Sequence, residues 1–506
     1  MIDATPLLRG YARMRLARLA QEDPAAAQRR TLLRLVRRAA GTRFGREHGF
    51  EAVRSVADYQ ARVPLRRYEE FWQAYWQPVF PQLGGVTWPG RIPALALSSG
   101  TSTGTTKYIP VSAAMARSNR LATLDVLTHH LNNYPRSHLL GGRNFMLGGS
   151  TELRQEGPGV RSGDLSGLAA AGVPVWARPW FFPPRKLALI ADWDRKIELL
   201  AQSSPAADIR SIAGTPSWLL LFFERLASVQ QEATQRLSRF YPRLELIIHG
   251  GVNFAPYRPR FDQWLEGSNA KLREVYPTSE GFIAVADRGP DEGMRLILDR
   301  GIFYEFVPID ELTAPFPARH RIENAELGVE YALVVSTCAG LWSYVLGDVV
   351  RLVDRAPPRL LVTGRTSYFL SAFGEHLTGE EIERAVLAAA AAIGAEVGEY
   401  SVGAESQEAQ GRHVFAVEFT RPPSGDALEA FAGALDAALS ASNDDYRTHR
   451  HGGQMLPPRI VAARAGAFAD WMRGRGRIGG QNKVPRVIGD ADLLASLLHA
   501  VSPKSG

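Results

Sequence analysis

The sequence predicts an α/β protein with a large N-terminal domain and a small C-terminal α+β domain. The length of 506 residues exceeds a single compact core and suggests two or three domains. Helical and strand-like patterns alternate through the first 365 residues, and the pattern changes after Gly364-Arg365. The remainder, about 140 residues, has a normal size for a separate domain. We therefore predict a large domain at 1–365 and a small, mobile domain at 366–506.

Hydrophobic periodicity gives the expected elements of the large domain. Residues 2–61 carry Leu, Ala and Arg at helical spacing, and the Gly- and Pro-rich run 153–184 is expected to be loop-rich. Short apolar and polar runs alternate through 294–353, which predicts an antiparallel or barrel-like part. Further helices are expected at 112–131, 187–200, 215–226 and 261–265, and strands at 92–97, 244–249 and 272–276.

A second set of patterns predicts the small domain. Residues 378–393 form an apolar helix with Glu380, Glu381 and Glu383 in its first turns, where acidic side chains favour the positive end of the helix dipole. The remaining elements are expected to be strands at 400–404, 414–419 and 459–463 and a helix at 427–440.

Composition argues against several classes of protein. The formal net charge of +7 is a mild bias that suits an anionic small molecule. Zinc-finger spacing, an RNP-like aromatic motif and a long Lys/Arg run are missing, so we expect no nucleic-acid partner. No apolar run approaches the roughly 18 residues of a membrane span, and we expect no membrane partner. With only Cys338 and no secretory signal, the chain is expected to be cytoplasmic.

The first informative string follows a short apolar strand pattern and is rich in hydroxyls. Its two glycines are too close together for a Walker A loop. Glycine lets the backbone approach a phosphate, and successive N–H groups form an anion nest, so a phosphate-binding loop is predicted. The alternative is a Ser/Thr-rich surface turn, with Lys107 in solvent. The string reads Ser98-Ser99-Gly100-Thr101-Ser102-Thr103-Gly104-Thr105-Thr106-Lys107.

The second string, Tyr276-Pro277-Thr278-Ser279-Glu280, places an aromatic face, two hydroxyls and a carboxylate at the end of a predicted strand. Tyr276 can stack on adenine, and Thr278 and Ser279 can hydrogen-bond an α-phosphate or an acyl group. Glu280 can hold Mg²⁺, which takes one or two carboxylates plus phosphate oxygens. The alternative is a strand end with a capping serine and an exposed glutamate.

The third string, Tyr344-Val345-Leu346-Gly347-Asp348, ends in a carboxylate that can accept both hydroxyls of a ribose. An aspartate in a glycine turn is the alternative, and Tyr344 could belong to the core. Gly364-Arg365 and a lone Lys483 in a Gly-rich stretch follow. Together these strings predict a site that holds ATP and joins its α-phosphate to a carboxylate.

The order of these strings resembles that of the adenylate-forming superfamily. The chain is most similar to the plant auxin-responsive acyl-acid–amido synthetases, the Gretchen Hagen family, and their bacterial relatives. The likeness spans nearly the whole chain and is more specific for adenylation than for the acceptor. The matching strings are 98–102, 276–280, 344–348 and Gly480-Gln481-Asn482-Lys483-Val484-Pro485-Arg486.

The resemblance implies an adenylate-forming large domain, a C-terminal lid, and a nucleotide site. Asp348 would bind the ribose, with Arg365 beside it at the hinge. The β- and γ-phosphates would be held by Ser98, Ser99, Gly100, Thr101 and Ser102, and the adenine, α-phosphate and metal would be surrounded by Tyr276, Thr278, Ser279 and Glu280.

The resemblance also implies a catalytic role for Lys483, between the acyl carboxylate and the α-phosphate, acting with Glu280 and Ser279. One position departs from the superfamily. An acidic hinge residue often stands two positions after the arginine, and here that residue is Ser367. The hinge position is therefore left open.

The pocket for the acid is expected between the first and second strings. Aromatic and leucine side chains there suggest an apolar or aryl acid. Core packing is the alternative for Trp218, and a satisfied buried imidazole is the alternative for His249. The candidate residues are Trp218, His249, Gly250, Gly251 and Val252.

The predicted function is ATP-dependent adenylation of a carboxylic acid, with release of pyrophosphate, followed by transfer of the acyl group from AMP to an amino acid amine. ATP and Mg²⁺ are the expected cofactors, and a small carboxylic acid and an amino acid are the expected partners. Two alternatives stay open: an acyl-CoA ligase, and a non-catalytic relative that binds a nucleotide or metabolite.

Overall fold

The computed structural model divides the chain into two compact units, which are described separately. The large unit comprises 1–98, 106–346 and 350–362, and the small unit comprises 99–105, 347–349 and 363–506. The structure describes residues 2–99, 106–148, 153–188, 190, 192–232, 234–251, 254, 257–290, 292–312, 314–366, 377, 379–407, 410–443, 446–447, 450, 455–475, 484–488 and 490–502.

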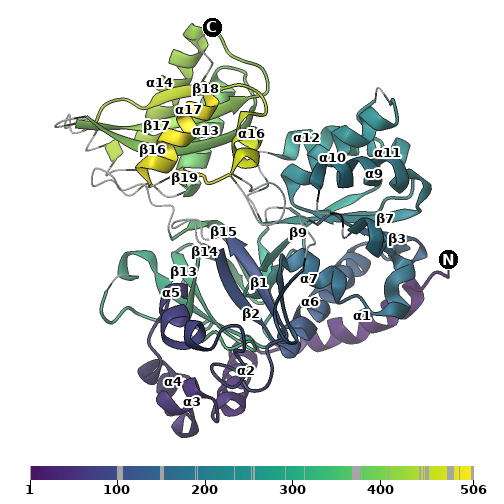
Figure 1. Ribbon diagram of the computed structural model, residues 1–506, viewed down its shortest axis with the longest axis vertical. Helices are drawn as coiled ribbons and strands as arrows, with labels where there is room; N and C mark the ends of the chain where they lie inside the picture. Colours follow the sequence, from purple (N-terminus) through teal and green to yellow (C-terminus); the bar gives the residue numbers. More distant parts are fainter. Residues whose placement is uncertain are drawn as a thin grey trace. The chain divides into compact units, whose positions relative to one another are not determined.

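An eleven-stranded sheet forms the centre of the large unit (Figure 1). Its strand order is β12-β13-β14-β15-β11-β10-β9-β8-β7-β3-β6. The strands are β3 Arg143–Met146, β6 Phe181–Phe182, β7 Ile209–Gly214, β8 Leu246–Gly250, β9 Lys271–Thr278, β10 Gly281–Val285, β11 Met294–Leu296, β12 Ile302–Pro308, β13 Glu330–Thr337, β14 Tyr344–Arg355 and β15 Pro358–Arg365.

The two halves of this sheet differ in strand direction. Strands β6, β3, β7, β8 and β9 pair in parallel, whereas β9–β10, β10–β11, β11–β15 and β12–β13 pair antiparallel. The antiparallel arrangement expected for 294–353 is confirmed. These antiparallel strands belong to the same sheet as the parallel strands. A local alternation of apolar and polar residues predicts strands but does not predict which strands pair.

A second sheet joins strands that are distant in sequence, in the order β2-β1-β5-β4. Ala94 on β1 pairs with Arg161 on β5 in parallel. The run 153–184, expected to be loop-rich, therefore contains regular structure, because its short strands are completed by β1. The elements are β1 Ala94–Ser99, β2 Thr106–Val111, β4 Arg154–Gly157, β5 Val160–Gly163 and α7 Leu165–Ala171.

Helices cover the sheets and enclose two main cores. Helix α6 contacts β10, and α10, α11 and α12 surround a core that contains Phe222 and Trp264. The helix expected at 187–200 is two helices, because Asp192 caps a new start by accepting a hydrogen bond from the Arg195 amide at 2.7 Å. The helices are α6 Ala113–Asn133, α8 Arg185–Ala188, α9 Trp193–Ser203, α10 Pro216–Val229, α11 Leu237–Phe240 and α12 Arg258–Leu265.

Helices fill the N-terminal segment, as its periodicity predicts. Helix α1 packs on α6, and α2 packs on β12. The apolar side of α2 enters the largest core through Leu32, Leu35 and Val36. The bounds are α1 Thr5–Ala20, α2 Pro24–Ala39, α3 Arg43–Glu47, α4 Val56–Arg62 and α5 Tyr68–Phe71.

The small unit is an α+β structure, with a four-stranded sheet in the order β18-β17-β16-β19. Strands β16 and β17 pair antiparallel, and β18 and β19 are added in parallel. Every helix and strand expected in this region is present. The elements are α13 Gly379–Ala392, β16 Val397–Gln407, β17 Gln410–Phe419, α14 Gly425–Ser442, β18 Arg459–Ala463, α16 Ala467–Gly474, β19 Val487–Ile488 and α17 Ala491–Val501.

Membrane spans were expected to be absent on hydropathy. Within the described ranges, no helix combines the length and the apolar character that crossing a bilayer requires.

Candidate active site

The carboxyl ends of the parallel strands β8 and β9 position the candidate site, as in other open α/β sheets. Gly250 ends β8, where a Cβ atom would lie 2.0 Å from the Val275 carbonyl oxygen of β9. Gly251 follows with φ +85°, a conformation that glycine adopts without strain. The two glycines therefore let β8 pass close to β9 and turn sharply beside the second string.

The second string forms the turn between β9 and β10. The Thr278 hydroxyl donates to the Gly281 carbonyl at 3.2 Å, and the Glu280 amide donates to Thr278 Oγ1 at 3.2 Å. These bonds fix the turn. The Ser279 Oγ atom is buried and has no hydrogen-bond partner among the described residues. A buried hydroxyl without a partner is costly, so this atom suits a polar ligand.

Glu280 is buried in this turn, with 8% of its surface exposed. Tyr344, at the start of β14, donates its hydroxyl to Glu280 Oε1 at 3.3 Å. Burial and the neighbouring carboxylate raise the pKa of Tyr344 well above its ordinary value, so the phenol stays protonated. Tyr344 thus belongs to the core and also orients the carboxylate that was expected to be exposed or to hold metal.

A second group of side chains approaches the Tyr344–Glu280 pair from the N-terminal region. The Lys107 ammonium lies 3.8 Å from a carboxylate oxygen of Glu69 and 5.3 Å from the centre of the Tyr68 ring. The Tyr68 hydroxyl accepts a hydrogen bond from the Tyr108 amide at 2.9 Å. Lys107 therefore contacts Glu69 and Tyr68, which disfavours the alternative of a lysine in solvent. Nothing in the local spacing of the sequence links Tyr68 or Glu69 to this site.

The first string is described only at its borders. Ser98 lies near the end of β1, and Ser99 is the last residue of that strand. Gly100, Thr101 and Ser102 lie outside the described residues. Beyond them the chain resumes in β2 and α6, and the Met115 side chain on α6 limits the space at Gly281 beside the second string. The strand predicted before the first string is confirmed as β1, whereas the strand β2 that follows the string was not predicted.

Asp348 lies on β14, four residues after Tyr344, and is buried, with 5% exposed. Gly347 before it has φ +93°, which a side chain would strain. The Gly347 carbonyl accepts a hydrogen bond from the Thr366 amide at 2.8 Å. Thr366 Oγ1 and Thr363 Oγ1 are buried and have no partner among the described residues. These two hydroxyls flank Arg365 in sequence, and the Thr366 backbone is joined by this hydrogen bond to Gly347, the residue before Asp348.

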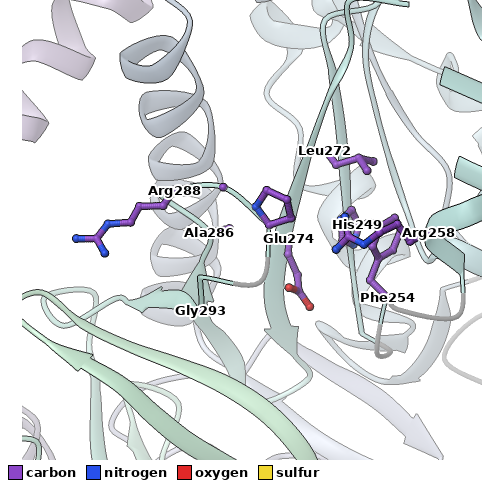
Figure 2. Close-up of a pocket in the computed structure, with 10 residues that line it drawn as sticks. His249, Phe254, Arg258, Leu272, Glu274, Ala286, Arg288 and Gly293 are labelled. Carbon is purple, nitrogen blue, oxygen red and sulfur yellow. The ribbon is translucent and has the colours of Figure 1, made fainter. Parts of the chain in front are cut away.

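A small pocket opens beside His249, the penultimate residue of β8 (Figure 2). The His249 ring stacks on Phe254 with 3.9 Å between ring centres, and the Arg258 guanidinium lies over Phe254. Glu274 of β9 and Arg288 line the other side. Burial, and to a lesser extent Arg258, lower the pKa of His249 to about 3, and its Nδ1 has no partner among the described residues. The imidazole is therefore neutral and unsatisfied, which favours the ligand-facing alternative.

Trp218 is not among the residues that line this pocket. Its ring lies 5.1 Å from the ring of Trp193, on the border of the core formed by α9 and α10. This arrangement favours core packing for Trp218, and its role in binding an acid stays a prediction. Val252 lies outside the described residues.

For the C-terminal candidate residues, the structure describes mainly the residues next to them in sequence. Lys483 and Ser367 lie outside the described residues, and Arg365 is described only as the last residue of β15. The segment after Lys483 is anchored in the small unit, where Pro485 accepts a hydrogen bond from Ser401 Oγ at 2.7 Å. Arg486 donates to the Tyr400 carbonyl at 3.0 Å. These bonds fix the C-terminal side of the lysine segment to β16.

Three domains of one family match the chain in order. The GH3 family N-terminal domain matches residues 13–167, the GH3 family central domain matches 295–365, and the GH3 family C-terminal domain matches 380–492. The chain belongs to the GH3 family. The first string falls in the N-terminal GH3 domain, Asp348 in the central domain and Lys483 in the C-terminal domain.

Curated relatives carry the same family name. Indole-3-acetic acid-amido synthetase GH3.8 of Oryza sativa subsp. indica is 30% identical over 276 residues, which are 50% of this chain and 45% of that protein. In the first matches the chain spans about half the length of the curated relatives.

Solved structures share the fold of this chain. GH3.15 acyl acid amido synthetase superposes with a TM-score of 0.81 at 18% identity, over 97% of this chain and 96% of that chain. 2-Hydroxyisobutyryl-CoA ligase in the postadenylation state gives a TM-score of 0.61 at 15% identity, over 94% and 92%. The predicted α/β fold, with a large N-terminal and a smaller C-terminal part, is confirmed.

Proposed function

We propose that this GH3 protein is an ATP-dependent, AMP-forming acyl-acid–amido synthetase, which joins a small carboxylic acid to the amine of an amino acid. The turn at 278–281 carries the proposal, because it buries a serine hydroxyl without a described partner next to a buried carboxylate. Its place at the carboxyl ends of β8 and β9 is the usual place for a ligand in this class of sheet. Amido synthetases of the same family support the reaction type.

In the first proposed step, a carboxylate oxygen of the acid attacks the α-phosphorus of ATP. The bond from that phosphorus to the bridging oxygen breaks, and pyrophosphate leaves. Both reactants are anions, so their approach is repulsive in a dry site. Lys483 would offset this repulsion where negative charge develops, and Ser279 would donate its hydroxyl to the α-phosphate or acyl group.

In the second step, the amine nitrogen attacks the acyl carbon of the adenylate. The new C–N bond gives the amide, AMP leaves with the bridging oxygen, and the amine loses a proton. Because the mixed anhydride reacts with water, the small domain is expected to act as a lid over it. The domain boundary at residue 365 and the hinge near Arg365 and Ser367 belong to this proposal.

The described residues suit ATP and Mg²⁺. No group of three or more His, Cys, Asp or Glu residues that could hold a metal occurs among them. Mg²⁺ needs no such cage, since one or two carboxylates and phosphate oxygens suffice. Glu280, oriented by Tyr344, would hold the ion, which would supply charge neutralisation at the phosphates. Tyr276 is proposed to bind adenine and Asp348 the ribose.

A thiol acceptor is the second candidate. The fold likeness to 2-hydroxyisobutyryl-CoA ligase supports this second candidate, because the same kind of adenylate can pass its acyl group to an amine or to coenzyme A. Mass spectrometry of reactions that contain ATP, Mg²⁺, a library of aryl and alkyl acids, and either amino acids or coenzyme A separates the two. We expect amides with amino acids and no thioester.

A matched pair of variants ties the product to the site. Glu280→Gln is expected to abolish product, whereas Glu266→Gln, at an exposed glutamate after α12, is expected to leave it unchanged. A thioester as the main product would favour the ligase. Absence of any product would favour a binding protein without catalysis.

A further inference from the structure

The positive charge of this chain is concentrated at its start. The first 46 residues contain eleven arginines and only three acidic residues. The whole chain has 59 basic and 52 acidic side chains, so the residues that follow carry no net positive charge. A charge asymmetry of this size suggests an anionic partner for the N-terminal segment.

Helix α2 holds five of these eleven arginines, and all five are exposed. Between Pro24 and Arg46 there are seven arginines and no acidic residue. Arg30, Arg34 and Arg37 are exposed and follow one another at helical spacing. They form no ion pair with any residue in the described part of the chain. Arg29 is also exposed, and Arg38 lies over the Trp88 ring.

Helix α1, which precedes α2 in the chain, exposes two large apolar side chains. Leu7 is 80% exposed and Met14 is 70% exposed, and Arg13 on the same helix is also exposed. Two exposed apolar side chains seven residues apart lie on one side of a helix. Figure 1 shows α1 and α2, in purple, following one another along one edge of the large unit.

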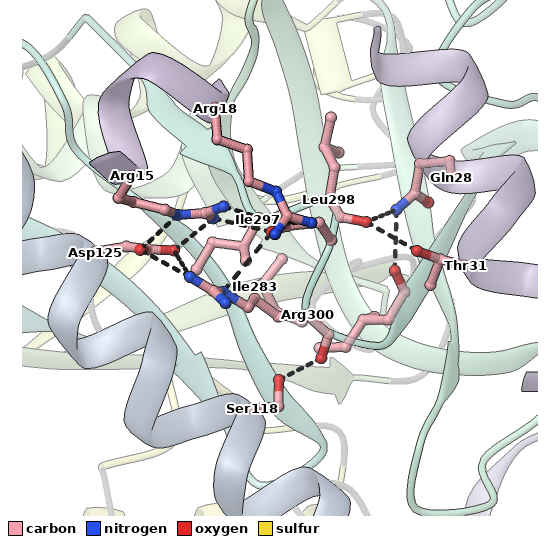
Figure 3. Close-up of polar contacts among 12 residues, drawn as sticks. Arg15, Arg18, Gln28, Thr31, Ser118, Asp125, Ile283, Ile297, Leu298 and Arg300 are labelled. Carbon is pink, nitrogen blue, oxygen red and sulfur yellow. Dashed lines mark hydrogen bonds and ion pairs between the residues drawn. The ribbon is translucent and has the colours of Figure 1, made fainter. Parts of the chain in front are cut away.

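Buried polar contacts fix both helices to the large unit (Figure 3). Arg15 of α1 makes two hydrogen bonds to Asp125 at 2.8 and 2.9 Å and two to Asp299 at 2.7 and 2.9 Å. Gln28 of α2 donates to the Leu298 carbonyl at 2.9 Å and Thr31 donates to the same oxygen at 3.2 Å. Helices α1 and α2 are therefore already folded and held in place, so their exposed faces need no folding step before they bind a partner.

We propose that the outer faces of α1 and α2 form a peripheral docking surface for an anionic lipid bilayer. The arginines meet the lipid phosphates, and Leu7 and Met14 enter the boundary between headgroups and acyl chains. Exposed apolar groups on α1 and exposed arginines without ion pairs on α2 favour a bilayer, because interfacial helices bind through both apolar burial and attraction to anionic lipids. A nucleic acid would use the arginines and leave Leu7 and Met14 in water. This surface revises the expectation of no membrane partner, which rested on membrane spans.

Vesicle co-sedimentation of the full-length protein tests the proposal. We expect binding to phosphatidylcholine vesicles that contain phosphatidylglycerol, weak binding to pure phosphatidylcholine, and release by salt. Since each surface arginine contributes roughly fivefold in affinity, R30E/R34E/R37E should lower the vesicle affinity at least tenfold. L7S/M14S should also lower it, while retaining all the charges.

The matched control reverses three arginines on other helices. Arg185, Arg195 and Arg239 are exposed on α8, α9 and α11 and form no ion pair with a described residue. The variant R185E/R195E/R239E should bind vesicles like the wild type, and far-ultraviolet circular dichroism should be equal in all variants. The proposal is overturned if the two triple variants bind anionic vesicles equally. It is also overturned if an RNA oligonucleotide is bound as tightly as the vesicles and L7S/M14S has no effect.

Discussion

At the scale of single residues, two neighbouring positions in the turn at 278–281, Ser279 and Glu280, have different roles. Ser279 keeps a buried hydroxyl without a described partner, while Glu280 is oriented by a tyrosine 64 positions later. The sequence could predict which side chains carry chemistry, because their types and order are specific. It could not predict that Tyr344 orients Glu280, because that contact depends on which strands become neighbours.

Removal of the Tyr344 hydroxyl tests the orientation of Glu280. Hydrogen bonds to charged groups contribute about 1.5–3 kcal/mol, so Tyr344→Phe should lower ATP–pyrophosphate exchange by about 10-fold or more. The loss should be largest at low Mg²⁺. Titration of Mg²⁺ in the exchange assay measures it, and Tyr134→Phe, at a tyrosine that is 39% exposed, is the control. Equal Mg²⁺ dependence in both variants would contradict the role of Tyr344.

Asp348 is expected to bind the ribose of ATP. Its replacement by alanine should weaken ATP binding by about 1.5–3 kcal/mol, the range for hydrogen bonds to a charged group. Isothermal titration calorimetry with ATP measures the change, and Asp310→Ala, at an exposed position, should leave the affinity unaltered. An unchanged affinity for Asp348→Ala would remove the ribose assignment.

At the scale of elements, the sequence predicts those with strong periodicity. Helices α6 and α10 and strand β8 follow the expected ranges closely. The run 153–184 differs because β4 and β5 are too short to leave a period, and only pairing with β1 completes them. The residues at 187–200 form two helices because Asp192 provides a cap within an otherwise continuous pattern.

The attachment of α1 depends on one buried arginine. Arg15 is 6% exposed, and its guanidinium joins Asp125 of α6 to Asp299. Removing one member of a buried ion pair leaves a charge uncompensated, which costs about 3–5 kcal/mol. Arg15→Ala should lower the free energy of unfolding by this amount in urea titrations, whereas exposed Arg13→Ala should change it by less than about 0.5 kcal/mol. Similar losses of stability in Arg15→Ala and Arg13→Ala would contradict the proposed role of Arg15 in attaching α1.

At the scale of the whole molecule, buried neutral histidines predict sensitivity to acid. Burial lowers the pKa of His129 to about 4 and that of His130 to about 3, and both lie on α6. His249 is lowered to about 3. The unfolded chain binds these protons first, so stability is full above the ordinary pKa of about 6.5 and falls as the pH drops below it.

The expected loss is about 1.4 kcal/mol per histidine for each pH unit below 6.5, until the folded pKa is reached. Urea unfolding at a series of pH values from about 7.5 to about 5, a range chosen around this pKa, measures it. His130→Gln should flatten the dependence by roughly one third. A stability that stays constant over this range would show that these histidines are not buried and neutral.

The change of sequence pattern after Gly364-Arg365 led to the prediction of a separate C-terminal domain, and the helices and strands that follow it enclose a core of their own. That core contains Val386, Phe415 and Leu435. The docking surface on α1 and α2 was not predicted, since a net charge of +7 looks mild when spread over the whole chain. A count along the chain shows that the excess lies in the first 46 residues, and the structure adds which of these arginines are exposed to solvent.

The most direct test of the proposed chemistry is ATP–pyrophosphate exchange, measured with a library of acids in the wild type and in Lys483→Ala. We predict exchange that requires an acid. We expect it to fall at least about 100-fold in the variant, as for the loss of a group that stabilises developing charge, while ATP affinity is retained. Exchange with no acid in the library, or normal exchange in Lys483→Ala, would contradict adenylation at this site.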